Sequence, residues 1–165
     1  MSGSNQQDQY YTLVPKLSEA WDESAQLGAD YKRVMTGFSF IMVGEGGVVK
    51  SASVHRGFLT NGYSLPVIPR LLIKKWLGDD CMAVVLHDWL SEYLLIESNY
   101  RCEQISIYEA LSMFIRALEM TTLTEVQIRT IQALCTTSML WRSPYKPRLK
   151  PFKRYIEDKS YCTCN

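Results

Sequence analysis

The sequence predicts an α+β domain in which a small antiparallel β-sheet is followed by a cluster of three to four helices. From residue 31, apolar and polar residues alternate, and two β-rich runs flank a glycine-rich loop, which is typical of a hairpin. After residue 66, apolar residues recur at helical spacing instead. The strand patterns come before the helical ones rather than alternating with them, which favours an α+β fold over an α/β fold.

Length and charge set the broad class of the protein. The chain has 165 residues, and we expect one core domain over residues 31–141. Residues 1–30 form an N-terminal extension with a short helix, and residues 142–165 form a basic, proline-rich segment, here named the C-terminal arm. The net charge of +1 argues against a surface dedicated to nucleic acid. No apolar run is long enough to span a bilayer, so we expect no membrane span.

The N-terminal half contains the predicted strands. Pro15 to Leu27 has an apolar stripe at helical spacing, which predicts a helix. The strands are predicted over Tyr31–Met35, Phe38–Val43 and Val48–Val54, and the glycine-rich loop 44–47 joins the last two.

The middle of the chain contains a turn and two helices. Asn61-Gly62 predicts a turn, and the prolines at 66 and 69 predict an extended entry to a short helix over residues 70–77. A second helix is predicted over residues 81–96, with Asp79 or Asp80 as its N-cap. This second helix is apolar on most of its circumference, so it is expected to be the buried central helix, with Trp89 and Leu90 in the core.

Two capping boxes predict the last two helices. Ser106 and Glu109 open a helix that runs to about Met120, and Thr124 and Gln127 open one that runs to about Trp141. The helical spacing predicts that five residues of the first of these helices face inward: Ala110, Met113, Phe114, Ala117 and Leu118.

His87 and Asp88 on the central helix are the candidate catalytic residues. Joined by Glu92 on the next turn and by His55, they would form a hydrolase-type metal site. Alternatively, His87 is a buried structural histidine, and the two acids lie at the surface or bind the turn at Asn61. No serine stands in a nucleophile elbow, and no cysteine has an assignable histidine partner.

Two segments are candidate binding sites. The loop 60–64 either positions a substrate or holds the His87 helix, and Thr60, Asn61 and Ser64 are its polar side chains. Residues 142–154 contain six basic residues, three prolines and no acid, with aromatic residues between them. This composition fits docking onto another protein, and contact with nucleic acid is the alternative. The candidate binding residues of the arm are Arg142, Tyr145, Lys146, Arg148, Lys150, Phe152, Lys153 and Arg154.

The five cysteines have no repeated spacing, and the N-terminus lacks a secretory pattern. We therefore expect a protein made in a reducing cytoplasm, without a disulfide framework. Cys162 and Cys164 supply only half of a metal site, and no metal or cofactor is predicted.

Three segments together resemble a known family. They are the run from Phe38 to Phe40, the segment Val54–Pro66 (VHRGFLTNGYSLP) and the segment Leu86–Leu90 (LHDWL). They are similar to the phage and prophage family catalogued as domain of unknown function 1353, whose members show "VPxGFxTDxASxP", "LLHDyLY" and a later "ADxxFxxAL". The resemblance covers residues 31–120. This chain has Asn61 and Leu111 where the family pattern has aspartates.

The resemblance implies a bacteriophage product made in the host bacterial cytoplasm and associated with the virion. Because two acids of the family pattern are replaced, we expect a binding or structural role rather than catalysis. The first hypothesis is a virion or assembly component that docks on other phage structural proteins, with homo-oligomerisation left open. The alternatives are a metal-dependent hydrolase, acting on cell wall and centred on His87 and Asp88, and a protein that binds a host factor.

Overall fold

The computed structural model describes residues 17–19, 31–43, 47–60, 65–78, 81–98 and 101–141. Within them the strands are β1 (Leu17–Glu19), β2 (Lys32–Val34), β3 (Phe38–Val43), β4 (Val49–Val54), β5 (Leu59–Thr60), β6 (Leu95–Ser98) and β7 (Arg101–Gln104). The helices are α2 (Val67–Leu77), α3 (Met82–Tyr93), α4 (Ile107–Glu119) and α5 (Glu125–Trp141). No helix of this part of the chain is long and apolar enough to cross a bilayer.

The strands form two antiparallel sheets rather than one. β1, β2 and β5 make a three-stranded sheet, and β3, β4, β6 and β7 make a four-stranded sheet in that order. β3 and β4 form the predicted hairpin, with Phe38 opposite Val54 and Val43 opposite Val49. Gly37 stands before the hairpin because a Cβ there would lie 2.8 Å from the Val54 carbonyl oxygen. The fold class is therefore α+β, as the sequence predicts.

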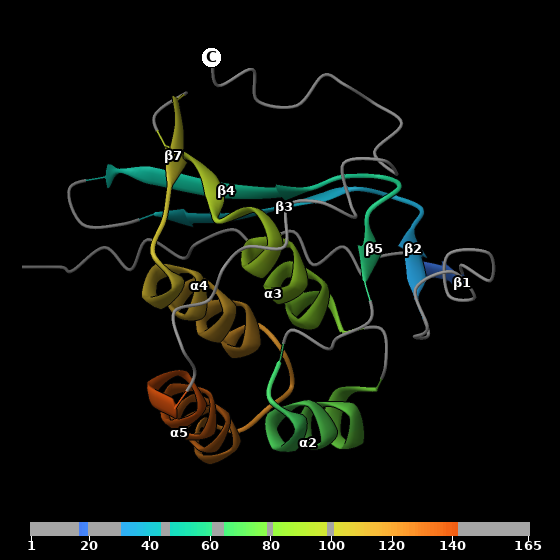
Figure 1. Cartoon of the computed structure of the whole chain (residues 1–165), viewed down its shortest axis with the longest axis vertical. Coiled ribbons are helices and arrows are strands. Elements are labelled where there is room, and N and C mark those ends of the chain that lie inside the picture. Colours follow the sequence, from blue (N-terminus) through green and yellow to red (C-terminus); the bar gives the residue numbers. More distant parts are fainter. Residues whose placement is uncertain are drawn as a thin grey trace, which may run out of the picture.

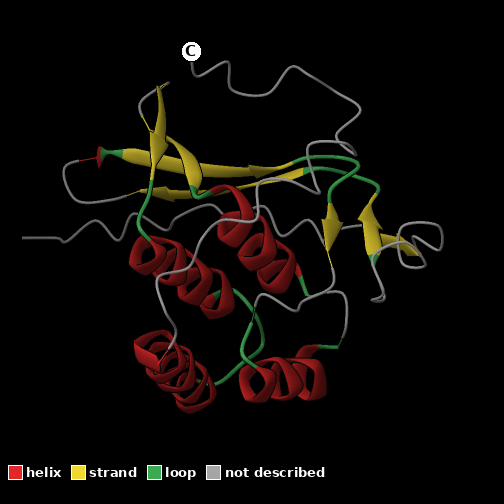
Figure 2. Ribbon diagram, in the orientation of Figure 1, coloured by secondary structure: helices red, strands yellow, loops and turns green. Residues whose placement is uncertain are grey.

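The helices lie in layers on one side of the four-stranded sheet (Figures 1 and 2). α3 packs against β4 and α4, whereas α5 packs against α4 and α2. The central helix therefore lies between the sheet and the other helices, where it contributes six apolar residues to the core: Ala83, Val85, Leu86, Trp89, Leu90 and the N-cap Cys81. Burial of Trp89 and Leu90 is confirmed.

Two sequence predictions about helices are wrong at their edges. Leu17–Glu19 is strand β1, paired with β2, so the N-terminal helix is not formed at these residues. The remainder of that predicted helix lies outside the described residues. α2 begins at Val67 rather than at residue 70. Pro69 is tolerated there because it lies in the first turn, where a backbone N–H has no hydrogen-bond partner within the helix.

The central helix is shorter than predicted. It begins after Cys81, which takes the N-cap position expected for Asp79 or Asp80, and it ends at Tyr93. Leu94 then adopts a left-handed backbone (φ 49°), and its N–H donates to the Leu90 carbonyl. The chain turns there into β6, so residues 95–96 are strand. β6 and β7, which the sequence analysis missed, come between α3 and α4 along the chain.

Both predicted capping boxes are formed. The Glu109 amide donates to Ser106 Oγ at 3.2 Å, and the Ser106 amide donates to Glu109 Oε2 at 2.9 Å. The Gln127 and Thr124 pair repeats this arrangement at 3.3 and 2.8 Å. The five residues of α4 predicted to face inward, Ala110, Met113, Phe114, Ala117 and Leu118, are all buried.

The cysteines among the described residues are of two kinds. Cys81 and Cys135 are free and buried, and burial raises the pKa of the Cys135 thiol to about 12. Cys102 in β7 is disulfide-bonded. The sequence analysis expected no disulfide framework, and the disulfide at Cys102 is contrary to that expectation.

Candidate functional site

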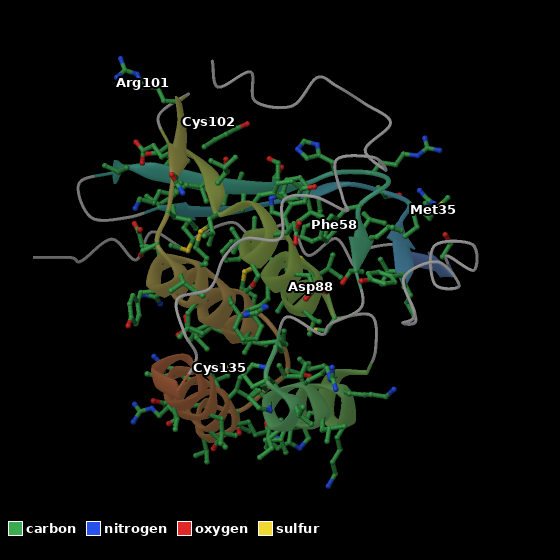
Figure 3. All side chains as sticks on the ribbon, in the orientation of Figure 1. Met35, Phe58, Asp88, Arg101, Cys102 and Cys135 are labelled. Carbon is green, nitrogen blue, oxygen red and sulfur yellow. The ribbon has the colours of Figure 1, made fainter. Side chains whose placement is uncertain are left out.

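A buried hydrogen bond joins the two motif segments. Thr60, at the end of β5, donates from its hydroxyl to Asp88 Oδ2 at 2.6 Å. Thr60 is 5% exposed and Asp88 is 7% exposed, so the bond lies in the interior. A hydroxyl bound to a buried carboxylate replaces water that the carboxylate loses on folding. The bond therefore fixes the end of the three-stranded sheet to the central helix, on which Asp88 is labelled in Figure 3.

Glu92 lies one helical turn beyond Asp88, so both acids project from the same side of α3. Glu92 is 7% exposed. The sequence analysis offered two structural positions for these acids, the surface or the turn at Asn61. The surface position is wrong, because both acids are buried.

His87 projects from another side of α3, towards α4. Its ring meets the ring of Phe114 edge-on, with centroids 4.8 Å apart. Its Nδ1 lies 3.3 Å from Ser91 Oγ, one turn further along the helix. Burial lowers the pKa of His87 to about 4, against the opposing effect of the Asp88 charge. His87 is therefore a neutral imidazole at physiological pH.

Leu111 occupies one of the positions where the family pattern has an aspartate. It lies three residues before Phe114, on the same side of α4, and packs against the core. An acid on this side of α4 would favour the charged form of a nearby histidine. With leucine there, the side of α4 that carries the His87 contact is apolar, in keeping with a neutral His87.

An aromatic cluster lies between α3 and residues 55–58, the segment that joins β4 of one sheet to β5 of the other. It contains His55, Phe58, Trp89 and Tyr93. Trp89 packs against Tyr93 with ring centroids 4.2 Å apart and the ring planes tilted, and Phe58 meets Trp89 edge-on at 5.1 Å. The sequence carried a signal for part of this cluster, since Trp89 and Tyr93 are four residues apart on a helix.

His55 packs on Trp89, with ring centroids 5.1 Å apart, and so belongs to the aromatic cluster. No three His, Cys, Asp or Glu side chains of the described chain are grouped so that they could hold a metal ion. The predicted cluster of His55, His87, Asp88 and Glu92 is therefore not assembled.

The described residues include only one of the residues predicted to bind a partner or substrate. Of the loop residues, Thr60 is described, and it holds the central helix rather than pointing outward. Asn61 and Ser64 lie outside the described residues. The same is true of all the arm residues: Arg142, Tyr145, Lys146, Arg148, Lys150, Phe152, Lys153 and Arg154.

These features define a small α+β protein in which Thr60 and Asp88, one polar residue from each motif segment, are buried and join a sheet to the central helix. The chain belongs to the family described as "Protein of unknown function (DUF1353)", whose model matches residues 34–133. That range contains both partners of the buried bond and the His87–Phe114 contact. No curated protein and no solved structure matches the chain.

Proposed function

We propose that this protein is a non-enzymatic bacteriophage virion or assembly component that docks on other phage structural subunits. The observation that carries the non-enzymatic part is the buried hydrogen bond from Thr60 to Asp88. It gives Thr60 and Asp88, one residue from each motif segment, a role in holding the fold, which leaves Asp88 poorly placed to act on a substrate.

The state of His87 supports the same conclusion. A general base is most effective when its pKa lies near the working pH. With a pKa of about 4, His87 is a weak base, and its ring lies against Phe114 rather than beside the Asp88 and Thr60 bond. Leu111 supplies neither a metal ligand nor a proton where the family pattern has an acid.

The phage assignment is supported by the motif resemblance described above. Docking is supported by the composition of the C-terminal arm, in which basic and aromatic residues alternate with prolines. Proline-rich chains are extended and lose little conformational entropy on binding, so such an arm suits a groove on a partner subunit.

The test is to find the protein in purified particles. A tagged copy is expressed in host cells that carry the source phage or prophage, and mature and immature particles are analysed by mass spectrometry. We expect the protein to be present in a constant ratio to the known structural subunits.

Two other outcomes would contradict the proposal. Capture of a host protein together with absence from every particle fraction would favour the host-factor hypothesis. Cell-wall hydrolysis by the purified chain would favour the hydrolase, provided that Asp88→Asn abolishes it, since that substitution keeps the shape of the side chain and an acceptor for Thr60.

A further inference from the structure

β3 is one of the two edge strands of the four-stranded sheet, and β7 is the other. The strand order is β3-β4-β6-β7, and no strand of the described chain pairs with the other side of β3. β3 is six residues long and pairs with β4 one to one along its whole length, without a bulge. An edge strand of this kind presents a row of backbone donors and acceptors to any strand that approaches it.

β3 lacks the usual protection of a sheet edge. Proteins prevent edge-to-edge pairing with charged side chains, prolines, bulges or very short edge strands. Residues 34–44 contain neither a charged residue nor a proline. Nothing in the side chains of β3 therefore opposes the addition of another strand.

The side chains of β3 suit a partner on both faces of the sheet. On the inner face, Phe38 and Phe40 are buried against the helices. On the outer face, Ile41 is 49% exposed and Val43 is 55% exposed, and Val49 of β4, opposite Val43, is 44% exposed. Pairing at the edge would cover part of this apolar surface as well as the backbone groups.

We propose that β3 pairs antiparallel with β3 of a second copy of this chain, so that the two four-stranded sheets become continuous across a twofold axis. Antiparallel pairing about an axis at Ile41 brings Ser39 opposite Val43 of the second copy and Phe40 opposite Met42. Each pair then lies on one face of the sheet, so inner residues meet inner residues. The uncharged strand does not repel itself, and a net charge of +1 adds little repulsion between copies.

This contact goes beyond docking on other subunits, because it predicts how the protein associates with itself. A twofold contact is closed, because it occupies the β3 edge of both copies. It therefore gives a defined dimer rather than an open filament.

The experiment compares two lysine substitutions in the full chain by sedimentation equilibrium over a wide concentration range. We expect the unaltered chain to reach twice its monomer mass and Ile41→Lys to remain monomeric, because like charges directly opposite each other oppose strand pairing. Val49→Lys is the matched control. It places the same charge on the same face, one strand away from the edge, and it should still dimerise.

Three outcomes would overturn the proposal: an unaltered chain that is monomeric throughout, an Ile41→Lys dimer, or equal loss of dimer in Val49→Lys. The last result would indicate that sheet faces stack. Hydrogen exchange is measured on the unaltered chain, so its result does not depend on whether a variant folds. The backbone amides of β3 should exchange more slowly as the concentration rises, and unchanged exchange would contradict edge pairing.

Discussion

At the scale of single residues, the hydrogen bond from Thr60 to Asp88 gives the two motif segments a shared structural role. Asp88 is an ionisable group inside the protein, and such groups are retained where a partner satisfies them. Here the partner comes from a strand 28 residues earlier in the chain. The bond is therefore a tertiary contact between motifs that sequence alone shows as separate.

A double-mutant cycle tests this bond. Thr60→Val removes the hydroxyl at constant shape, and it should lower the free energy of unfolding by about 1.5–3 kcal/mol, the range for a hydrogen bond to a charged group. Asp88→Ala should also destabilise. The double variant should lose less than the sum of the two, because each single variant already breaks the same interaction. Additive losses in denaturant unfolding would show that the two residues do not stabilise each other.

The low pKa of His87 predicts that the folded protein loses stability in acid. Its folded pKa of about 4 lies below the ordinary value of 6.5. As the pH falls below 6.5, the unfolded chain takes up a proton at this residue and the folded chain does not, so stability is lost between pH 6.5 and 4. Between pH 7 and pH 5, the free energy of unfolding should fall by about 2 kcal/mol from this residue.

The control for this effect is His87→Gln, which does not titrate and keeps a polar group near Ser91. Denaturant unfolding at the two pH values should show a smaller loss in the variant than in the unaltered chain. An identical loss in both proteins would mean that His87 is not held neutral by its surroundings.

At the scale of elements, α3 is the helix on which the other parts are built. Its residues contact the four-stranded sheet, α4 and the end of β5, so it has no face that belongs to the solvent alone. Asp88 and His87 project in different directions, Asp88 towards β5 and His87 towards α4. The helix is thus both the centre of the core and the connection between the two sheets.

Truncation of Leu90 measures this role. Leu90 is 0% exposed, so Leu90→Ala should cost about 2–5 kcal/mol by leaving a cavity. Leu71→Ala on α2 is the matched control, since Leu71 is 57% exposed and its loss should change stability by less than about 0.5 kcal/mol. Thermal melts compare the two, and equal melting temperatures would place α3 at the periphery.

At the scale of the whole molecule, the core and the C-terminal arm are expected to have separate roles. The family model ends at residue 133, and the described core ends with α5 at Trp141. The basic residues of the arm repel one another and its prolines cannot donate backbone hydrogen bonds, so the arm is not expected to stabilise the core through noncovalent contacts.

Deletion of residues 142–165 is the matching variant for the particle experiment. With a reductant present, so that the disulfide of Cys102 contributes to neither protein, we expect the shortened protein to melt at nearly the same temperature as the full chain. We also expect it to be lost from purified particles. A shortened protein that unfolds would show that the arm stabilises its own core, and the docking proposal would then lose its support.

The sequence by itself determined the α+β class, the β3–β4 hairpin, both capping boxes and the inward side of α4. Each of these depends on residues close together in the chain, where periodicity and turn chemistry are sufficient. The tertiary structure decided that Asp88 binds Thr60, that His87 meets Phe114 and that His55 joins the aromatic cluster. It also decided that Leu17–Glu19 is a strand and that α3 ends at Tyr93. These outcomes depend on which distant segment packs beside each residue, and packing overrides local preference because burial is worth more than propensity.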